Sequence, residues 1–173
     1  MNGVEGPVTA SCKPLRGRNG GFSLIELLVV VAIILIIAAI ALPSLMHSRM
    51  AANEAGAAES VRTVTTGETT YAAACPDIGY SATLQELNTG ALCASGKNII
   101  DDVLGASDPS YKSGYQFVYT VSASNGVNII FTVVGLPVAP GISGNRGFLS
   151  DQSGVIRYTL NGSTPLLSSS ALQ

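Results

Sequence analysis

The hydrophobic and polar positions of the chain separate one continuous apolar run from a mixed remainder. Residues 22–42 are apolar throughout except for Ser23 and Glu26, near the start of the run. A helix rises about 1.5 Å per residue, so about 20 apolar residues cross a hydrocarbon layer about 30 Å thick. The pattern therefore predicts a membrane-spanning helix over residues 22–42.

The next segment, residues 43–74, has the pattern of a helix that packs one face against a folded domain. Apolar and small side chains recur near one face, at Ala57, Ala58, Val61, Val64 and Tyr71. Pro43 removes one helical hydrogen bond, so we expect a kink there. Gly56 and Gly67 each weaken a helix by about 1 kcal/mol relative to Ala. We expect the helix to end before Cys75-Pro76-Asp77.

The remainder, residues 75–173, is predicted to be a globular head with a loop-rich first part and an antiparallel sheet. Short helices are expected near residues 83–87 and 99–104. Extended runs follow at residues 115–121, 127–134, 148–150 and 155–160. Turn signals at residues 124–126 and 151–154 join these runs in pairs, and the polar tail from Asn161 is expected to be frayed. A long helix followed by an antiparallel meander is an α+β fold.

The charges indicate how the predicted membrane helix is oriented. Lys13, Arg16 and Arg18 lie before the apolar run, and such positive charge stays on the cytoplasmic side of a membrane. The N-terminus is therefore expected to be cytoplasmic, with the head outside. The whole chain has a net charge of −2 and scattered Lys and Arg. Nucleic acid is not predicted as a partner, because its binding needs a basic face.

The leader, residues 1–21, differs from an ordinary secretory signal in the order of its parts. A secretory signal has its small-residue cleavage site after the apolar core, whereas Gly20-Gly21 precede the apolar run here. Cutting after Gly21 would leave the helix on the mature chain. Glu26 is the second unusual feature, because an ionisable residue within a membrane helix is expensive and by default has a function and a partner.

One stretch carries a family resemblance: Gly21-Phe22-Ser23-Leu24-Ile25-Glu26-Leu27. It resembles the class III signal of type IV prepilins and type II secretion pseudopilins, and the basic leader and Pro43 extend the match over the first third of the chain. The resemblance implies that a prepilin peptidase cuts between Gly21 and Phe22 and that the new Phe22 amine is N-methylated. It also implies the pilin fold, in which the second half of the helix packs on a sheet of about four strands.

The implied cleavage gives Glu26 a candidate partner. The new Phe22 amine is cationic and lies one helical turn from Glu26. We expect an ion pair between them, formed between neighbouring subunits, that neutralises both charges and sets the register of assembly. Removing one member of a buried ion pair costs about 3–5 kcal/mol.

Three cysteines occur, at positions 12, 75 and 93. Cys12 lies in the leader, whereas Cys75 and Cys93 lie in the part expected outside the cytoplasm. An oxidising compartment permits a disulfide between these two, worth about 3 kcal/mol in the chain-entropy description. Two free thiols are the alternative, because the sequence does not show how closely their Cα atoms approach.

The sequence presents no constellation of catalytic residues. The chain has a single histidine, no Ser/His/Asp set can be argued, and no enzyme activity or cofactor is predicted. Asp101, Asp102 and Asp108 form the one acidic cluster, whose spacing matches no calcium-loop pattern, so helix capping and a solvated loop are preferred and no metal site is predicted. His47 and Arg49 are expected to contact lipid headgroups.

Three functions remain open on the sequence. A type IV pilin builds long fibres for adhesion, twitching motility or DNA uptake, whereas a type II secretion pseudopilin builds a short periplasmic filament for protein export. Either would be a single-pass inner-membrane protein that polymerises with itself or other pilins, with an inner-membrane assembly platform and ATPases as partners. The third function is that of a membrane-anchored periplasmic domain that never polymerises. The disulfide candidate and the lack of a recognisable calcium pattern favour the pilin.

Overall fold

The computed structural model describes residues 21–89 and 99–172. Its internal contacts divide the chain into two units, Met1–Ile40 and Ala41–Gln173. A single helix, α1 (Leu24–Ala74, 51 residues), begins in the first unit and ends in the second. The predicted long helix is therefore confirmed, and Pro43 lies inside it without ending it. A bend at Pro43 remains a prediction.

In the first unit, α1 is an apolar helix that has no buried side chain. Ser23 precedes the helix, and its carbonyl accepts hydrogen bonds from the N–H groups of Glu26 (3.1 Å) and Leu27 (3.2 Å). This backbone cap explains why the helix begins two residues after the predicted start. From Leu24 to Ile40 the side chains are exposed, apart from a half-buried Ala38.

In the second unit, α1 supplies one wall of the hydrophobic core. Ala57, Val61, Val64 and Tyr71 are fully buried, as the apolar spacing predicted. Gly67 lowers helix propensity but has a packing role, because a Cβ there would lie 3.0 Å from Ile99 Cγ2 and 3.1 Å from the side chain of Leu87. The absence of a side chain thus lets the next segment of the head approach the helix closely.

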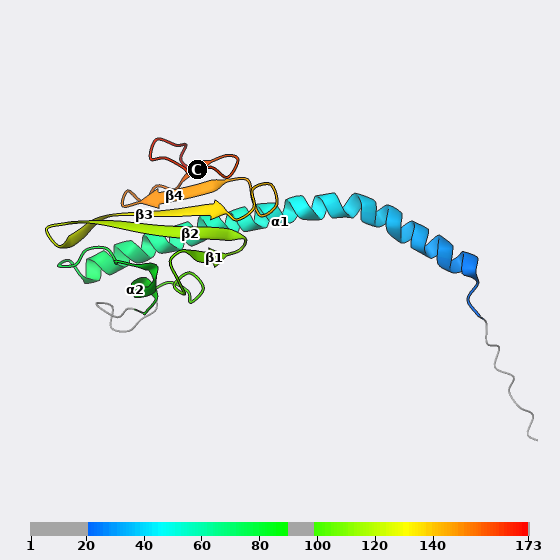
Figure 1. Cartoon of the computed structure of the whole chain (residues 1–173), viewed down its shortest axis with the longest axis horizontal. Coiled ribbons are helices and arrows are strands. Elements are labelled where there is room, and N and C mark those ends of the chain that lie inside the picture. Colours follow the sequence, from blue (N-terminus) through cyan, green and yellow to red (C-terminus); the bar gives the residue numbers. More distant parts are fainter. Residues whose placement is uncertain (1–20, 90–98, 173) are drawn as a thin grey trace, which may run out of the picture. The chain divides into compact units, whose positions relative to one another are not determined.

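The head carries a five-stranded antiparallel sheet with strand order β1-β2-β3-β4-β5 (Figure 1). The strands are β1 (Ser110–Lys112), β2 (Tyr115–Ser124), β3 (Val127–Pro137), β4 (Gly147–Asp151) and β5 (Arg157–Thr159). Four of them correspond to the predicted runs, and β1 is additional. Between β2 and β3, Asn125 and Gly126 have φ values of 52° and 82°. Two successive left-handed residues define the tight hairpin turn that the Ser-Asn-Gly sequence predicted.

The core lies between α1 and one face of this sheet, along which α1 runs in Figure 1. Phe117, Phe131, Val133 and Phe148 contribute buried side chains from three neighbouring strands. Gly135 on β3 gives space to this layer, because a Cβ there would lie 2.9 Å from the Phe117 ring. The helix and the sheet thus form the two-layer α+β architecture that the sequence predicted.

A short helix, α2 (Leu84–Thr89), confirms the prediction near residues 83–87 and buries Leu84 and Leu87. The predicted helix at residues 99–104 is wrong. The segment forms a single turn, in which the carbonyl of Asp101 accepts a hydrogen bond from Gly105 N–H at 3.1 Å. The Asp101 carboxylate accepts two more, from the N–H groups of Val103 and Leu104. An Asp that bonds its own following backbone favours a turn over a continued helix.

The C-terminal tail also differs from expectation, because it is held against β5 and its flanks. Tyr158 N–H donates to the carbonyl of Ser170 at 2.9 Å, and Leu172 N–H donates to the carbonyl of Ile156 at 2.7 Å. Pro165 is buried. The polar composition of the tail predicted fraying, but backbone hydrogen bonds do not depend on side-chain polarity.

A buried carboxylate joins α1 to the loop that follows it. Glu68 is fully buried, and its two oxygens accept hydrogen bonds from the backbone N–H and the hydroxyl of Ser81, at 2.9 and 2.6 Å. Tyr119, from β2, donates its hydroxyl to the carbonyl of Ser81 at 2.9 Å. Burial raises the pKa of Glu68, with nearby Glu86 adding to the effect, although the bonds from Ser81 oppose it.

We expect Glu68→Gln to change how stability depends on pH. Because the pKa of folded Glu68 lies above its ordinary value of 4.5, the stability of the protonated form is fully present below that pH and is lost as pH rises through the folded pKa. The variant lacks this loss. As pH rises, its free energy of unfolding should therefore increase relative to that of the wild type, by about 1.4 kcal/mol for each unit by which the folded pKa is raised.

The measurement is urea unfolding of the full chain in detergent, followed by circular dichroism between pH 4 and 8. Glutamine can keep both bonds, since Ser81 Oγ also lies 3.1 Å from the carbonyl of Thr83 and can donate there. Glu59→Gln is the control, because Glu59 lies on the same helix and its ion pair with Arg62 is exposed. If the free energy of unfolding of Glu68→Gln instead decreased relative to that of the wild type as pH rises, the raised pKa would be contradicted.

Candidate processing and assembly segment

The predicted cleavage junction lies in accessible backbone just before α1. Gly21, Phe22 and Ser23 belong to no helix or strand. A Cβ on Gly21 would meet no atom within 4 Å, and the Phe22 side chain is 81% exposed. A peptide bond in such a segment can enter a protease site without the unfolding of any regular structure.

Glu26 lies in the first turn of α1, where the partial positive charge of the helix N-terminus stabilises a carboxylate. Its side chain is exposed, and no ion pair among the described residues includes it. Phe22 lies four positions earlier but outside the helix. In the uncut chain its nitrogen is a peptide nitrogen, so the Phe22–Glu26 ion pair can form only after cleavage and stays a prediction.

The side chains that follow form an apolar surface that no other part of the described residues covers. Exposed fractions are 64% for Leu35, 76% for Ile40 and 60% for Leu42. Among the described residues, one helix, α1, is long and apolar enough to cross a membrane. Burying each such side chain is worth about 1.5–3 kcal/mol, so contact of this surface with other hydrocarbon is strongly favoured over contact with water.

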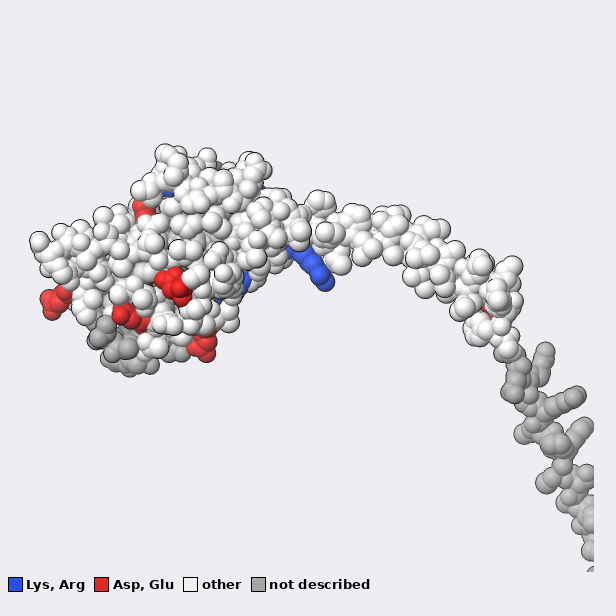
Figure 2. Space-filling view, in the orientation of Figure 1, with Lys and Arg blue, Asp and Glu red and all other residues white. Residues whose placement is uncertain are grey.

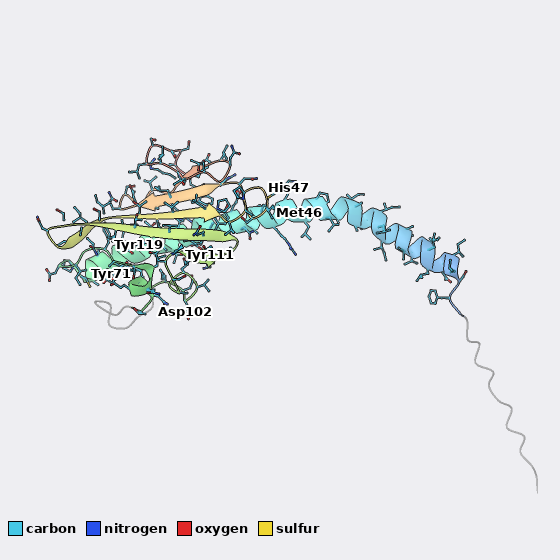
Figure 3. All side chains as sticks on the ribbon, in the orientation of Figure 1. Met46, His47, Tyr71, Asp102, Tyr111 and Tyr119 are labelled. Carbon is cyan, nitrogen blue, oxygen red and sulfur yellow. The ribbon has the colours of Figure 1, made fainter. Side chains whose placement is uncertain are left out.

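Just after the apolar run, α1 changes from an exposed apolar helix to a helix packed against the head. Met46 and His47 lie on the stretch of α1 that leads into the head (Figure 3). His47 and Arg49 are exposed, and Arg49 enters none of the ion pairs in the described ranges. Met50, one residue later, is the first buried side chain of α1. The transition from exposed apolar surface to packed core therefore occurs within about one helical turn.

Cys75 follows α1 directly and is 6% exposed. Its N–H completes the helix by donating to the carbonyl of Tyr71 at 3.0 Å. The expected partner, Cys93, and the leader residues with Cys12 lie outside the described residues. The disulfide between Cys75 and Cys93 therefore remains a prediction.

The acidic cluster is occupied with structural contacts. Asp101 forms an ion pair with Lys112 at 2.8 Å, and Asp108 accepts a hydrogen bond from Tyr119 N–H at 3.2 Å. Partial burial by itself would raise the pKa of Asp101, but the bonds from Lys112 and the backbone outweigh it and lower the pKa. Within residues 21–89 and 99–172, no group of three His, Cys, Asp or Glu side chains could hold a metal ion.

The connection between β3 and β4 is tied to α1 in a way that the sequence did not reveal. We refer to residues 138–146 as the 138–146 loop. Asn53 Nδ2 donates to the carbonyl of Ser143 at 2.9 Å. Glu54 accepts a hydrogen bond from Asn145 N–H at 2.7 Å and pairs with Arg146 at 3.3 Å. The Pro and Gly content of this segment predicted a loop, but nothing in it indicated a contact about 90 positions away.

Comparison with protein-family models gives one match, to the prokaryotic N-terminal methylation motif, over residues 16–42. Comparison with curated proteins gives no match. The matched segment contains the last leader residues, the Gly21–Phe22 junction, Glu26 and the whole apolar run. Its family consists of structural subunits that prepilin peptidase processes. The chain therefore carries an N-terminal signal of the type IV pilin and pseudopilin type.

Proposed function

We propose that this protein is a structural subunit of a type IV pilus-like extracellular filament. The observation that carries the proposal is the methylation motif at residues 16–42, joined to a helix whose apolar side chains are exposed in the part of the chain that the structure describes. Before assembly the subunit is a single-pass inner-membrane protein, with a cytoplasmic N-terminus and a periplasmic head. In the filament, residues 22–42 pack against the same segments of other subunits, so the apolar surface is covered in both states.

Cleavage between Gly21 and Phe22 creates the group that directs assembly. Prepilin peptidase frees and methylates the Phe22 amine, which pairs with Glu26 of a neighbouring subunit. Both charges are then neutralised inside the apolar bundle, where either alone would be costly. Head-to-tail packing of this kind does not close on itself and gives an open helical polymer, built with an inner-membrane assembly platform and its ATPases.

We further propose that Cys75 and Cys93 are joined by a disulfide that closes the loop after α1. The buried position of Cys75 supports this proposal, because a disulfide at a buried cysteine is shielded from reducing thiols in the folded head. Equal incorporation of a thiol reagent before and after reduction of the denatured protein would overturn it.

Two alternatives follow from the same motif. A type II secretion pseudopilin would polymerise into a short periplasmic filament for protein export, and a membrane-anchored periplasmic domain would not polymerise. The candidate disulfide favours the pilin over the pseudopilin. The motif favours both filament subunits over the plain anchor, because an anchor has no need of a cleavage junction in front of its helix.

Processing should be visible in the intact mass of the purified subunit. We expect the loss of residues 1–21 and the gain of one methyl group on Phe22, measured by mass spectrometry. Gly21→Leu should retain the full-length mass, because a branched side chain at the junction obstructs the protease. Gly20→Ala, one residue from the cut, is the control and should be processed. A wild-type chain that keeps its full mass in cells with an active prepilin peptidase would identify a plain anchor.

Glu26→Leu should assemble poorly in cells that also make the wild-type subunit. The variant keeps the helix and its apolar character but leaves the Phe22 amine without a counter-charge. We expect its share in sheared filaments to fall at least tenfold below its share in the membrane, measured by quantitative mass spectrometry. Glu59→Gln, which removes an exposed carboxylate elsewhere on α1, should incorporate normally. If the share of Glu26→Leu in filaments equalled its share in the membrane, the proposed ion pair between Glu26 and the Phe22 amine would be wrong.

Electron microscopy of sheared surface material should show long fibres that an antibody against the head decorates. A pilin predicts such fibres in cells that express the chain at its natural level and predicts none after its deletion. Surface fibres that persist unchanged in the deletion strain, together with an export defect, would assign the chain to a secretion pseudopilus instead.

A further inference from the structure

We propose that the 138–146 loop, with the adjacent exposed face of α1 around Arg49, is a docking surface for a phospholipid bilayer that carries anionic headgroups. The subunit would use it before assembly, holding the head against the membrane in which α1 is anchored. The proposal rests on the membrane anchorage put forward above, and it adds a second, peripheral contact made by the head itself.

The loop presents apolar side chains to solvent at its tip. Val138 is 59% exposed and Ile142 is 68% exposed, and Pro140 and Gly141 between them are also exposed. A Cβ on Gly141 would meet no atom within 4 Å, so the space beside Gly141 at the tip is open. Apolar side chains held out on a loop are the kind that enter the boundary between headgroups and acyl chains.

Several polar backbone groups of the loop are paired within it, which lowers the cost of leaving water. The carbonyl of Ala139 accepts bonds from the N–H groups of Ile142 (3.0 Å) and Ser143 (2.8 Å), and Gly141 N–H donates to the carbonyl of Gly144 at 3.0 Å. The hydroxyl of Ser143 accepts a bond from Ala139 N–H at 3.1 Å. Unpaired N–H and C=O groups would prevent contact with lipid, but these are paired.

The loop is also fixed in place against residues 53 and 54 of α1. Its bonds to Asn53 and Glu54 hold it to the helix, and Val138 N–H donates to the carbonyl of Gly114 at 3.0 Å. Met46, still 55% exposed, lies seven positions before Asn53, which is about 10 Å along the helix. Each headgroup layer is about 5–8 Å thick, so the loop lies at the level where an inserted α1 would leave the membrane.

The charges at this level suit an anionic surface. Arg49 is exposed between the apolar run and the loop, and Arg146 at the end of the loop is 45% exposed while it pairs with Glu54. In the view of Figure 2, basic side chains lie where α1 enters the head, and acidic ones are distributed over the rest of it. Apolar tips flanked by arginine fit the boundary of a bilayer with anionic headgroups.

The chain has no tryptophan, so a single introduced indole reports its own surroundings. We would reconstitute the full chain in vesicles of phosphatidylcholine and phosphatidylglycerol that contain lipids brominated near the headgroup end of the acyl chain. Ile142→Trp is the test. Ile129→Trp is the matched control, because Ile129 is 50% exposed and lies at the opposite end of β3, about 30 Å from Val138 along the strand. Leu35→Trp reports insertion of α1.

We expect bromine quenching of Ile142→Trp to exceed that of Ile129→Trp at least twofold, with a blue-shifted emission. Strong quenching of Leu35→Trp together with equal, weak quenching at positions 142 and 129 would overturn the docking surface while leaving the membrane anchor intact. Absent quenching at Leu35→Trp would overturn both. A blue shift at position 142 that lacks bromine quenching and grows with protein density would indicate contact between copies and would also overturn the proposal.

Two further variants protect the test against a local failure to fold. Val138→Trp, at the other exposed apolar position of the loop, should be quenched as Ile142→Trp is, and quenching no greater than that of Ile129→Trp would count against the proposal. Replacing phosphatidylglycerol by phosphatidylcholine, or Arg49→Gln in the Ile142→Trp background, should lower the quenching. Equal quenching under all of these conditions would overturn the role assigned to anionic headgroups.

Discussion

The apolar surface on the first part of α1 is the constraint on which the rest of this molecule depends. From Leu24 to Met46 the helix carries large hydrophobic side chains, none of which is buried within the chain. If this surface were exposed to water, the favourable free energy of burying apolar groups, which drives folding and association, would be lost. Every state proposed here, in the bilayer or in a filament, covers it with other hydrocarbon. The match to the N-terminal methylation motif, over residues 16–42, includes most of the same surface.

The second part of the same helix has the opposite role, because it is built into the head. Val61, Val64 and Tyr71 are core residues, and Glu68 and Asn53 hold two separate loops to the helix, at Ser81 and at Ser143. The head is thereby fixed to residues 50–74 of α1 by packing and by hydrogen bonds. A force or a contact at this part of α1 is transmitted to the head without an intervening linker, as expected for close-packed interiors.

Local sequence signals predicted the elements that are specified by residues adjacent in the sequence. The apolar run, the spacing of buried positions on α1 and the Asn125-Gly126 turn each depend on neighbouring residues, and each was recovered. Strand β1 was missed because three residues, Ser110–Lys112, carry too little periodicity to indicate a strand without their partner β2. The tail after Asn161 was misread because its hydrogen bonds to the flanks of β5 use the backbone, on which side-chain polarity has no bearing.

The sequence by itself determined the apolar helix, the position of Glu26 and the proposed processing junction, because each is a property of adjacent residues read in order. Only the tertiary structure decided which distant groups meet. Glu68 is buried because Ser81 and Tyr119 converge on one place, and the 138–146 loop is held to α1 because Asn53 and Glu54 bond to its backbone. Such pairings depend on how the chain returns on itself in three dimensions, and one sequence read along its length contains no local signal for them.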